Sequence, residues 1–153
     1  GQGLDRMQRQ LAVLPRRLNP RSLYRDGLEA LRAGRLQEAR DLLNSLLELH
    51  PRSDYADNAL FWIGETYYRE GKLDQAALKF AEVEKRYPKG NKVPAALLRE
   101  ARCLERLGQR QAAVMVLRKL IRNWPRAPEA REARSRLKQL GGGRHGKPKG
   151  AGS

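Results

Sequence analysis

Three prolines, Pro51, Pro88 and Pro125, stand 37 residues apart, and other residue types recur at the same interval. An internal period of this length is typical of a repeat array, in which stacked helical hairpins share one continuous core. The residues that repeat are glycines, alanines and bulky apolar side chains: Gly34, Gly71 and Gly108; Ala39, Ala76 and Ala113; and Leu43, Phe80 and Leu117. Because such arrays present extended binding surfaces, the period favours a protein-binding scaffold.

The recurring glycines and prolines also predict where helices begin and end. Glycine favours the left-handed conformation that ends a helix, and proline cannot continue one. We therefore predict three helical hairpins, over 22–33 and 36–50, 54–70 and 73–87, and 94–107 and 110–124. They form a domain over 20–140, with repeats 20–53, 57–90 and 94–127. A last helix over 127–140 places Ala130, Ala133, Leu137 and Leu140 on one face and is polar elsewhere, as in a terminal cap.

Both ends of the chain lie outside this domain. Residues 1–19 place Leu4, Met7, Leu11 and Leu14 at the a/d spacing of a coiled-coil seam, which would allow homo-oligomers. Two heptads do not establish a coiled coil, so a short amphipathic helix is the alternative. Residues 141–153 have no apolar side chain able to anchor them, and we expect a disordered basic tail there.

The chain is strongly basic, with 32 Lys and Arg against 17 Asp and Glu and a net charge of +15. Such a balance suggests nucleic acid, a membrane surface or an acidic protein as a partner. Over 20–125, however, basic and acidic residues are interleaved, which is typical of solvated helix faces. The excess is concentrated at the ends: residues 126–153 hold eight basic residues against two acidic ones. No run approaches the roughly 18 apolar residues of a membrane-spanning helix.

The second hairpin shows the core pattern most fully. Its first helix carries an apolar stripe and a small residue: Leu60, Ile63, Tyr67 and Gly64. Its second helix carries a small residue and two bulky ones, Ala76, Phe80 and Val83, and ends before Pro88. This pattern resembles the tetratricopeptide repeat (TPR) almost position for position. The pair Gly64 and Ala76 is expected to let the two backbones approach closely. The resemblance implies an all-α, right-handed superhelix of three TPR-like hairpins with a C-terminal capping helix.

The period of 37 exceeds the 34 residues of the ordinary repeat. The run YADNALFWIGETYY over 55–68, with KVPAALL over 92–98, is similar to the C-terminal domain of the YbgF family of periplasmic Tol-Pal-associated proteins, also called cell division coordinators CpoB. The similarity covers about 20–140. It implies a non-catalytic periplasmic adaptor that binds a TolA-like partner and coordinates outer-membrane constriction with peptidoglycan synthases. The basic tail is not part of that family pattern.

The first helix of each hairpin is expected to line a concave face, and its outward positions are the candidates for partner contact. They are Tyr24, Asn58, Phe61, Trp62, Glu65, Tyr68, Arg69, Leu98 and Arg102. Aromatic anchors beside a few polar groups are what binding hot spots favour. Phe61 and Trp62 have a second interpretation, in which one of them packs into the neighbouring hairpin and only the other is exposed.

The sequence gives no sign of catalysis, a cofactor or a metal. His50 and His145 are isolated, and neither has the spacing of a metal ligand. Cys103 is the single cysteine, which excludes an internal disulfide, and we expect it to be a small buried apolar residue. Two other functions stay open: a scaffold in outer-membrane protein or pilus and secretin assembly, and a binder of nucleic acid or an anionic surface. The second is disfavoured, because no aromatic-rich RNA-binding pattern is present.

Overall fold

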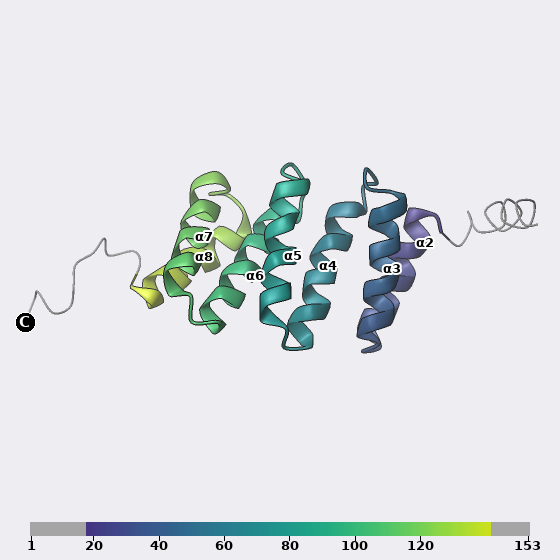
Figure 1. Cartoon of the computed structure of the whole chain (residues 1–153). Helices are drawn as coiled ribbons and strands as arrows, with labels where there is room; N and C mark the ends of the chain where they lie inside the picture. Colours follow the sequence, from purple (N-terminus) through teal and green to yellow (C-terminus); the bar gives the residue numbers. More distant parts are fainter. Residues whose placement is uncertain (1–17, 142–153) are drawn as a thin grey trace, which may run out of the picture.

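The structure, a computed structural model, describes residues 18–141, and within them the chain is all-helical. The helices are α2 Pro20–Arg32, α3 Leu36–Leu49, α4 Ala56–Arg69, α5 Leu73–Arg86, α6 Val93–Arg106, α7 Arg110–Asn123 and α8 Pro128–Leu140. They form three stacked hairpins and one further helix (Figure 1), which confirms the predicted fold class. The predicted seam over 4–14 and the tail over 142–153 lie outside the described residues.

Local chemistry at the helix ends accounts for these bounds. Gly34, Gly71 and Gly108 have φ angles of 81°, 77° and 78°, the left-handed conformation predicted for them. Beyond the first of these, the backbone N–H of Arg35 donates to the carbonyl of Ala30 at 2.9 Å, which satisfies a carbonyl of the last turn. The helix α2 begins at Pro20, two residues earlier than predicted, because proline suits the first turn and the Asn19 side chain caps it.

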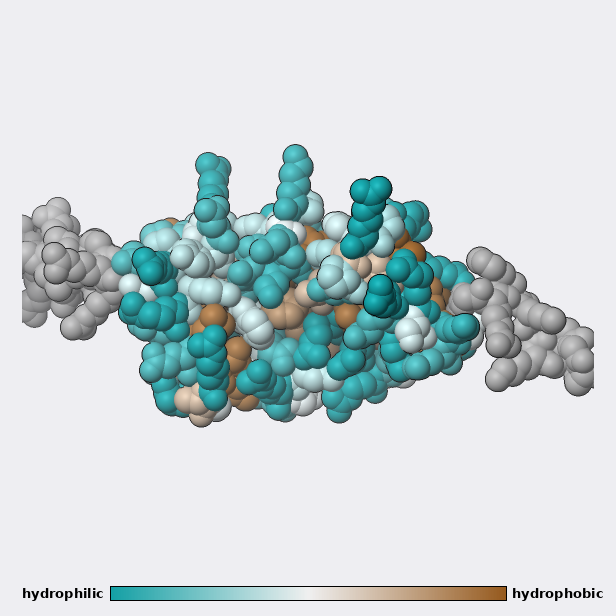
Figure 2. Space-filling view, turned by 180° about the vertical axis from the view of Figure 1, so that it is seen from behind, coloured by the Kyte–Doolittle hydropathy of each residue, from teal (hydrophilic) through white to brown (hydrophobic). Residues whose placement is uncertain are grey.

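The hairpins stack so that the helices fall into two rows. The first helices of the hairpins and the capping helix contact one another in the order α2, α4, α6, α8. The second helices α3, α5 and α7 form the row that faces the viewer in Figure 1. Figure 2 shows the opposite side, where apolar side chains appear in patches between polar ones. We call the surface formed by α2, α4, α6 and α8 the first-helix face.

The core runs between the two rows from Leu23 in α2 to Leu137 in α8. In the second hairpin Gly64 allows a close approach of the two helices, because a Cβ atom there would lie 2.8 Å from Cε1 of Phe80. A Cβ atom at Gly27 would meet Cδ2 of Leu43 at 2.7 Å. In both hairpins the glycine of the first helix leaves room for a bulky side chain of the second helix. That side chain is Leu43 in the first hairpin and the Phe80 ring in the second.

The last hairpin is covered by α8, which packs on α7 and α6. Its buried residues are Ala130, Ala133 and Leu137, three of the four predicted to face inward, and Leu140 is half-buried. Cys103 is buried within α6, as predicted, and burial raises the pKa of its thiol to about 11. A thiol with this pKa stays protonated at neutral pH and is a poor nucleophile.

Candidate partner-binding surface

The first-helix face carries an aromatic cluster centred on α4, which lies between α2 and α6. The indole Nε1 of Trp62 donates a hydrogen bond of 3.1 Å to the hydroxyl of Tyr24 in α2. Tyr24 in turn lies with its ring centroid 5.1 Å from that of Tyr55. Trp62 and Tyr24 are both half-buried, so each keeps part of its ring accessible. The cluster therefore joins two repeats and still offers aromatic surface to a partner.

Phe61 is buried, whereas Trp62 beside it is half-buried. Phe61 is only 7% exposed and packs against Phe80 in the core, at a centroid distance of 5.4 Å. Its ring also meets the edge of Trp62 at 5.0 Å. The Nζ of Lys92, in the turn before α6, lies 4.9 Å from the Phe61 centroid and 5.2 Å from that of Trp62. Only one ring of this pair is accessible, as the second interpretation had it: Phe61 is buried and Trp62 is half-buried. The inward ring packs on Phe80 of its own hairpin, however, and not into the neighbouring one.

The second half of α4 carries a carboxylate held by arginines. Glu65 is 9% exposed and pairs with Arg69, whose Nε lies 3.3 Å away, and with Arg99 from α6. The guanidinium of Arg99 also lies 4.3 Å from the ring centroid of Tyr68, and that of Arg106 lies 5.4 Å from it. The Tyr68 ring therefore makes cation–π contacts with two guanidinium groups. Because both arginines come from α6, this arrangement forms only when the second and third hairpins stack.

The remaining predicted residues extend the surface to either side. Leu98 and Asn58 are half-buried, and the Asn58 Oδ1 is buried with no hydrogen-bond donor among the described residues. Arg102 is exposed, and its guanidinium lies 3.6 Å from the Glu132 carboxylate of α8. All nine predicted residues therefore lie on three neighbouring helices of one row. Their contact with a partner stays a prediction.

The sequence did not point to Lys92 or Arg99, although the repeat contains the signal for one of them. Arg99 lies one 37-residue period after Trp62, so it occupies in α6 the position that the indole occupies in α4. A second row is visible in the same way, since Arg32, Arg69 and Arg106 share this spacing and are all exposed. The spacing of surface positions, taken in register with the core, is therefore the signal that identifies Arg99.

The charge of this surface is positive. Three of its carboxylates are engaged by arginines: Glu65 as above, Glu105 by Arg136, and Glu132 by Arg102. No carboxylate of residues 18–141 lies within 4 Å of the cationic groups of Lys92 or Arg106. Both cations rest on aromatic rings instead, with their other side available to an anionic group of a partner.

Neither a metal-binding cluster nor a membrane-spanning helix occurs in the described part of the chain. Over 18–141 there is no cluster of His, Cys, Asp and Glu able to hold a metal ion. None of the helices in that range has the length and apolar character needed to cross a membrane. The features that the structure brings together are those of a surface that binds another molecule through rings and charges.

Comparison with known proteins places this arrangement in a family. Two tetratricopeptide repeat models match, over residues 24–91 and 95–127, which together are more than half of the chain. The Arabidopsis OM64 TPR domain is similar in structure, with a TM-score of 0.64 at 16% identity over 78% of this chain and 94% of that one. The Yersinia enterocolitica type III secretion chaperone SycD, in complex with a peptide of the translocator YopD, has a TM-score of 0.65 at 19% identity over 78% and 87%.

At these identities the two structures show the fold alone. No curated protein sequence matches the chain significantly. The family models match the segments in which the 37-residue period, the helical hairpins and the glycine–aromatic core occur. The chain belongs to the tetratricopeptide repeat proteins, and its repeats form a protein-binding scaffold.

Proposed function

We propose that this scaffold is a periplasmic adaptor of the Tol-Pal machinery, which binds a TolA-like partner through the first-helix face. In this role it coordinates constriction of the outer membrane with peptidoglycan synthesis during cell division, and it catalyses no reaction itself. The similarity of the run over 55–68 to the YbgF and CpoB family supports the cellular role. The geometry of the first-helix face supports the mode of binding.

The observation that carries the proposal is the cluster of rings and cations on α4 and α6. Trp62 and Tyr68 are half-buried rings held in place by Tyr24 and Arg99, so little side-chain freedom is lost when a partner covers them. Tryptophan, tyrosine and arginine are the residue types that contribute most to binding energy in protein interfaces. A segment of a partner that lies along α4 would bury both rings at once.

The test is a binding titration of the chain with the domains of a TolA protein. The variant Trp62→Ala/Tyr68→Ala removes both accessible rings, and we expect it to weaken binding by about 2–4 kcal/mol, or roughly 30- to 1000-fold. A matched control is Leu78→Ala/Met115→Ala, because these apolar side chains are 68% and 71% exposed on α5 and α7 in the other row. The control is expected to bind as the wild-type chain does.

Three results would count against parts of the proposal. If the wild-type chain binds no TolA domain, the adaptor role in the Tol-Pal machinery is wrong. If it binds but the ring variant binds equally well, the partner uses another surface. If the control variant loses binding instead, the second-helix row is the interface.

A further inference from the structure

A basic residue follows each of the three repeat prolines. Arg52, Lys89 and Arg126 are therefore also 37 residues apart, and all three are exposed. Each lies in the turn that joins one hairpin to the next, between α3 and α4, α5 and α6, and α7 and α8. We call these three residues the inter-hairpin row. None of them belongs to the core or to the aromatic cluster on the first-helix face.

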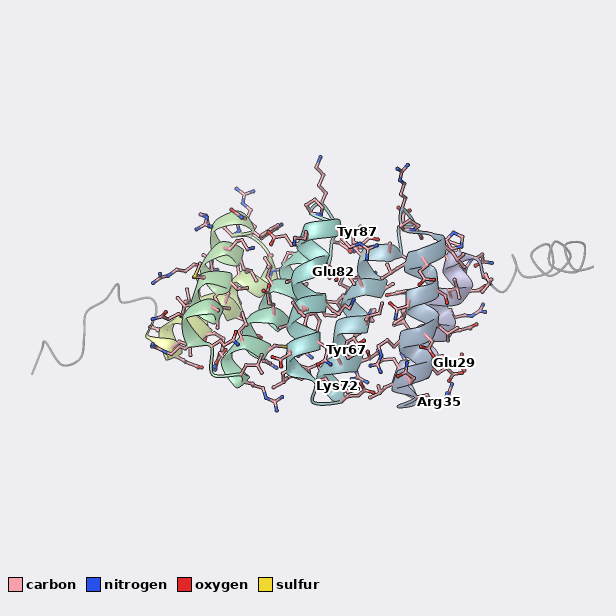
Figure 3. The ribbon with its side chains drawn as sticks, viewed as in Figure 1. Glu29, Arg35, Tyr67, Lys72, Glu82 and Tyr87 are labelled. Carbon is pink, nitrogen blue, oxygen red and sulfur yellow. The ribbon has the colours of Figure 1, made fainter. Side chains whose placement is uncertain are left out.

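The architecture brings the row to one edge of the molecule. The turns between hairpins all lie along the same edge in Figure 1, and the turns within hairpins lie along the opposite one. Figure 3 marks the two edges: Tyr87, which precedes a repeat proline, labels the first, and Arg35 and Lys72 label the second. In Figure 2 long polar side chains project from the first edge, away from the body of the protein.

Two of the cations at the opposite edge are neutralised by nearby carboxylates, whereas the inter-hairpin row has no such partner. At the opposite edge Arg35 pairs with Glu38, and Lys72 lies 3.5 Å from Glu70. Within residues 18–141, no carboxylate lies within 4 Å of the cationic group of any member of the inter-hairpin row. The row is thus a line of unpaired positive charges.

The surroundings of the row become more basic along the chain. Two exposed cations, Lys85 and Arg122, repeat in the last turns of α5 and α7, while the corresponding position in α3 is Glu48. Asp54 also lies in the first inter-hairpin turn. Acidic residues thus flank Arg52 on both sides, and Arg126 has Glu129 in the first turn of α8. The added cations Lys85 and Arg122 make this edge more basic in the second and third repeats than in the first.

We propose that this edge docks the protein on an anionic phospholipid surface. A flat surface meets a line of projecting cations along one edge at the same time, and each lysine or arginine near anionic headgroups adds to the affinity. A single-stranded nucleic acid would favour accessible rings beside the charges. The neighbouring rings, Tyr87 and Trp124, are half-buried and packed against the core, and the Tyr87 hydroxyl already donates a hydrogen bond of 2.9 Å to the carbonyl of Pro51. They therefore offer less ring surface than a stacked base would cover.

This docking goes beyond the proposed adaptor function and uses a different surface. The first-helix face stays open to a protein partner while the edge contacts lipid. The two proposals can therefore fail separately: loss of TolA binding leaves the lipid contact untouched, and loss of the lipid contact leaves the first-helix face intact.

The test is sedimentation of the full chain with phosphatidylcholine vesicles that contain or lack phosphatidylglycerol. The row variant is Arg52→Glu/Lys89→Glu/Arg126→Glu. The control variant is Arg35→Glu/Lys72→Glu/Arg110→Glu, which changes exposed residues in or beside the turns of the opposite edge. Each replacement lowers the net charge by two, so the net charge of both variants is +9 instead of +15. The terminal segments are the same in both variants. Circular dichroism and thermal melting check that both are folded.

We expect the wild-type chain to sediment with the anionic vesicles at low salt and to dissociate from them at high salt. It should not sediment with the neutral vesicles. The row variant should bind about 100-fold more weakly, and the control variant should lose much less. Equal losses in the two variants would mean that only net charge matters, and the proposal would be wrong. It would also fail if the wild-type chain did not sediment, or if it bound an oligonucleotide more tightly than the vesicles through the same three residues.

Discussion

Glu100 occupies in α6 the position that Ile63 occupies in α4, one 37-residue period earlier. The isoleucine is fully buried in the core, and the glutamate at the equivalent place is half-buried. Burial raises the pKa of the Glu100 carboxyl to about 7, with Lys119 lowering it and Glu84 raising it further. Lys119 of α7 and Glu84 of α5 pair with each other at 2.6 Å, so the Glu100 carboxyl lies beside an ion pair of the two neighbouring helices. The equivalent position in α2 is also acidic, Asp26.

The raised pKa predicts a pH dependence with a definite sign. The folded state favours the protonated acid, so the stability linked to Glu100 is fully present below its ordinary pKa of 4.5 and is lost as pH rises to about 7. Glu100→Gln keeps the shape and removes the charge. We expect it to be more stable than the wild-type chain at pH 8 by on the order of 1–3 kcal/mol, with the difference shrinking below pH 4.5.

Denaturant titrations at pH 4 and pH 8 would measure this difference. Glu48→Gln is the control, because it removes the same charge from an exposed site on α3. The same change in stability between the two pH values for the wild-type chain and Glu100→Gln would contradict the assignment.

Between helices, Arg40 shows where prediction from the sequence reaches its limit. Helix bounds could be predicted because proline and glycine act locally at each end. The core could be predicted because its apolar residues repeat in register. Arg40 follows Ala39 on α3 and reads as an ordinary surface arginine, yet it is 4% exposed. What buries it is α4, in the next repeat: Thr66 and Glu70 accept its hydrogen bonds, and the Tyr67 ring lies 4.2 Å from its guanidinium.

The same limit applies to the partner-binding surface. The sequence identifies which helix positions face outward, because that depends on helical spacing alone. Whether Phe61 is accessible depends on Lys92 and Trp62, which cover it, and on Phe80 behind it. Contacts between repeats decide such cases, and the period shows only which positions are equivalent.

Arg40 is expected to hold the first and second hairpins together. Arg40→Met keeps most of the side-chain volume and removes the guanidinium that bonds Glu70 at 2.8 Å. We expect a loss of about 1–3 kcal/mol in the free energy of unfolding, because a largely enclosed ion pair is broken on one side only. Arg35→Met removes an exposed pair with Glu38 on the same helix, and its cost should be below about 1 kcal/mol. If the two substitutions lower the free energy of unfolding equally in chemical denaturation, the contact of Arg40 with Glu70 contributes no more than an exposed ion pair does.

The Arg40 contact also predicts an acid-side effect. Its hydrogen bond is the main cause that lowers the pKa of the Glu70 carboxyl below 4.5. A lowered pKa contributes stability above pH 4.5 that is lost as pH falls through the folded-state value. In Arg40→Met this contribution should be absent, so wild-type and variant stabilities should converge in acid.

At the scale of the whole molecule the chain behaves as a short row of modules, each of which contacts its neighbours. The core is continuous along the row, and the two proposed surfaces lie on different sides of it: the first-helix face for a protein, and the inter-hairpin edge for an anionic surface. In such an array stability is a sum of units and interfaces, so a change at one end acts first on the nearest module.

The cap is expected to protect the third hairpin more than the first. Truncation after residue 127 removes α8, with the buried Ala130, Ala133 and Leu137 and the Arg136–Glu105 pair, and exposes apolar surface of α6 and α7. In hydrogen exchange, amide protection in α6 and α7 should fall about tenfold or more, while α2 and α3 change much less. Truncation after residue 141 is the control, since it removes only the terminal segment. A uniform loss of protection over all helices would mean that the domain opens as one cooperative unit, and a loss in both truncations would assign the protection to residues beyond α8.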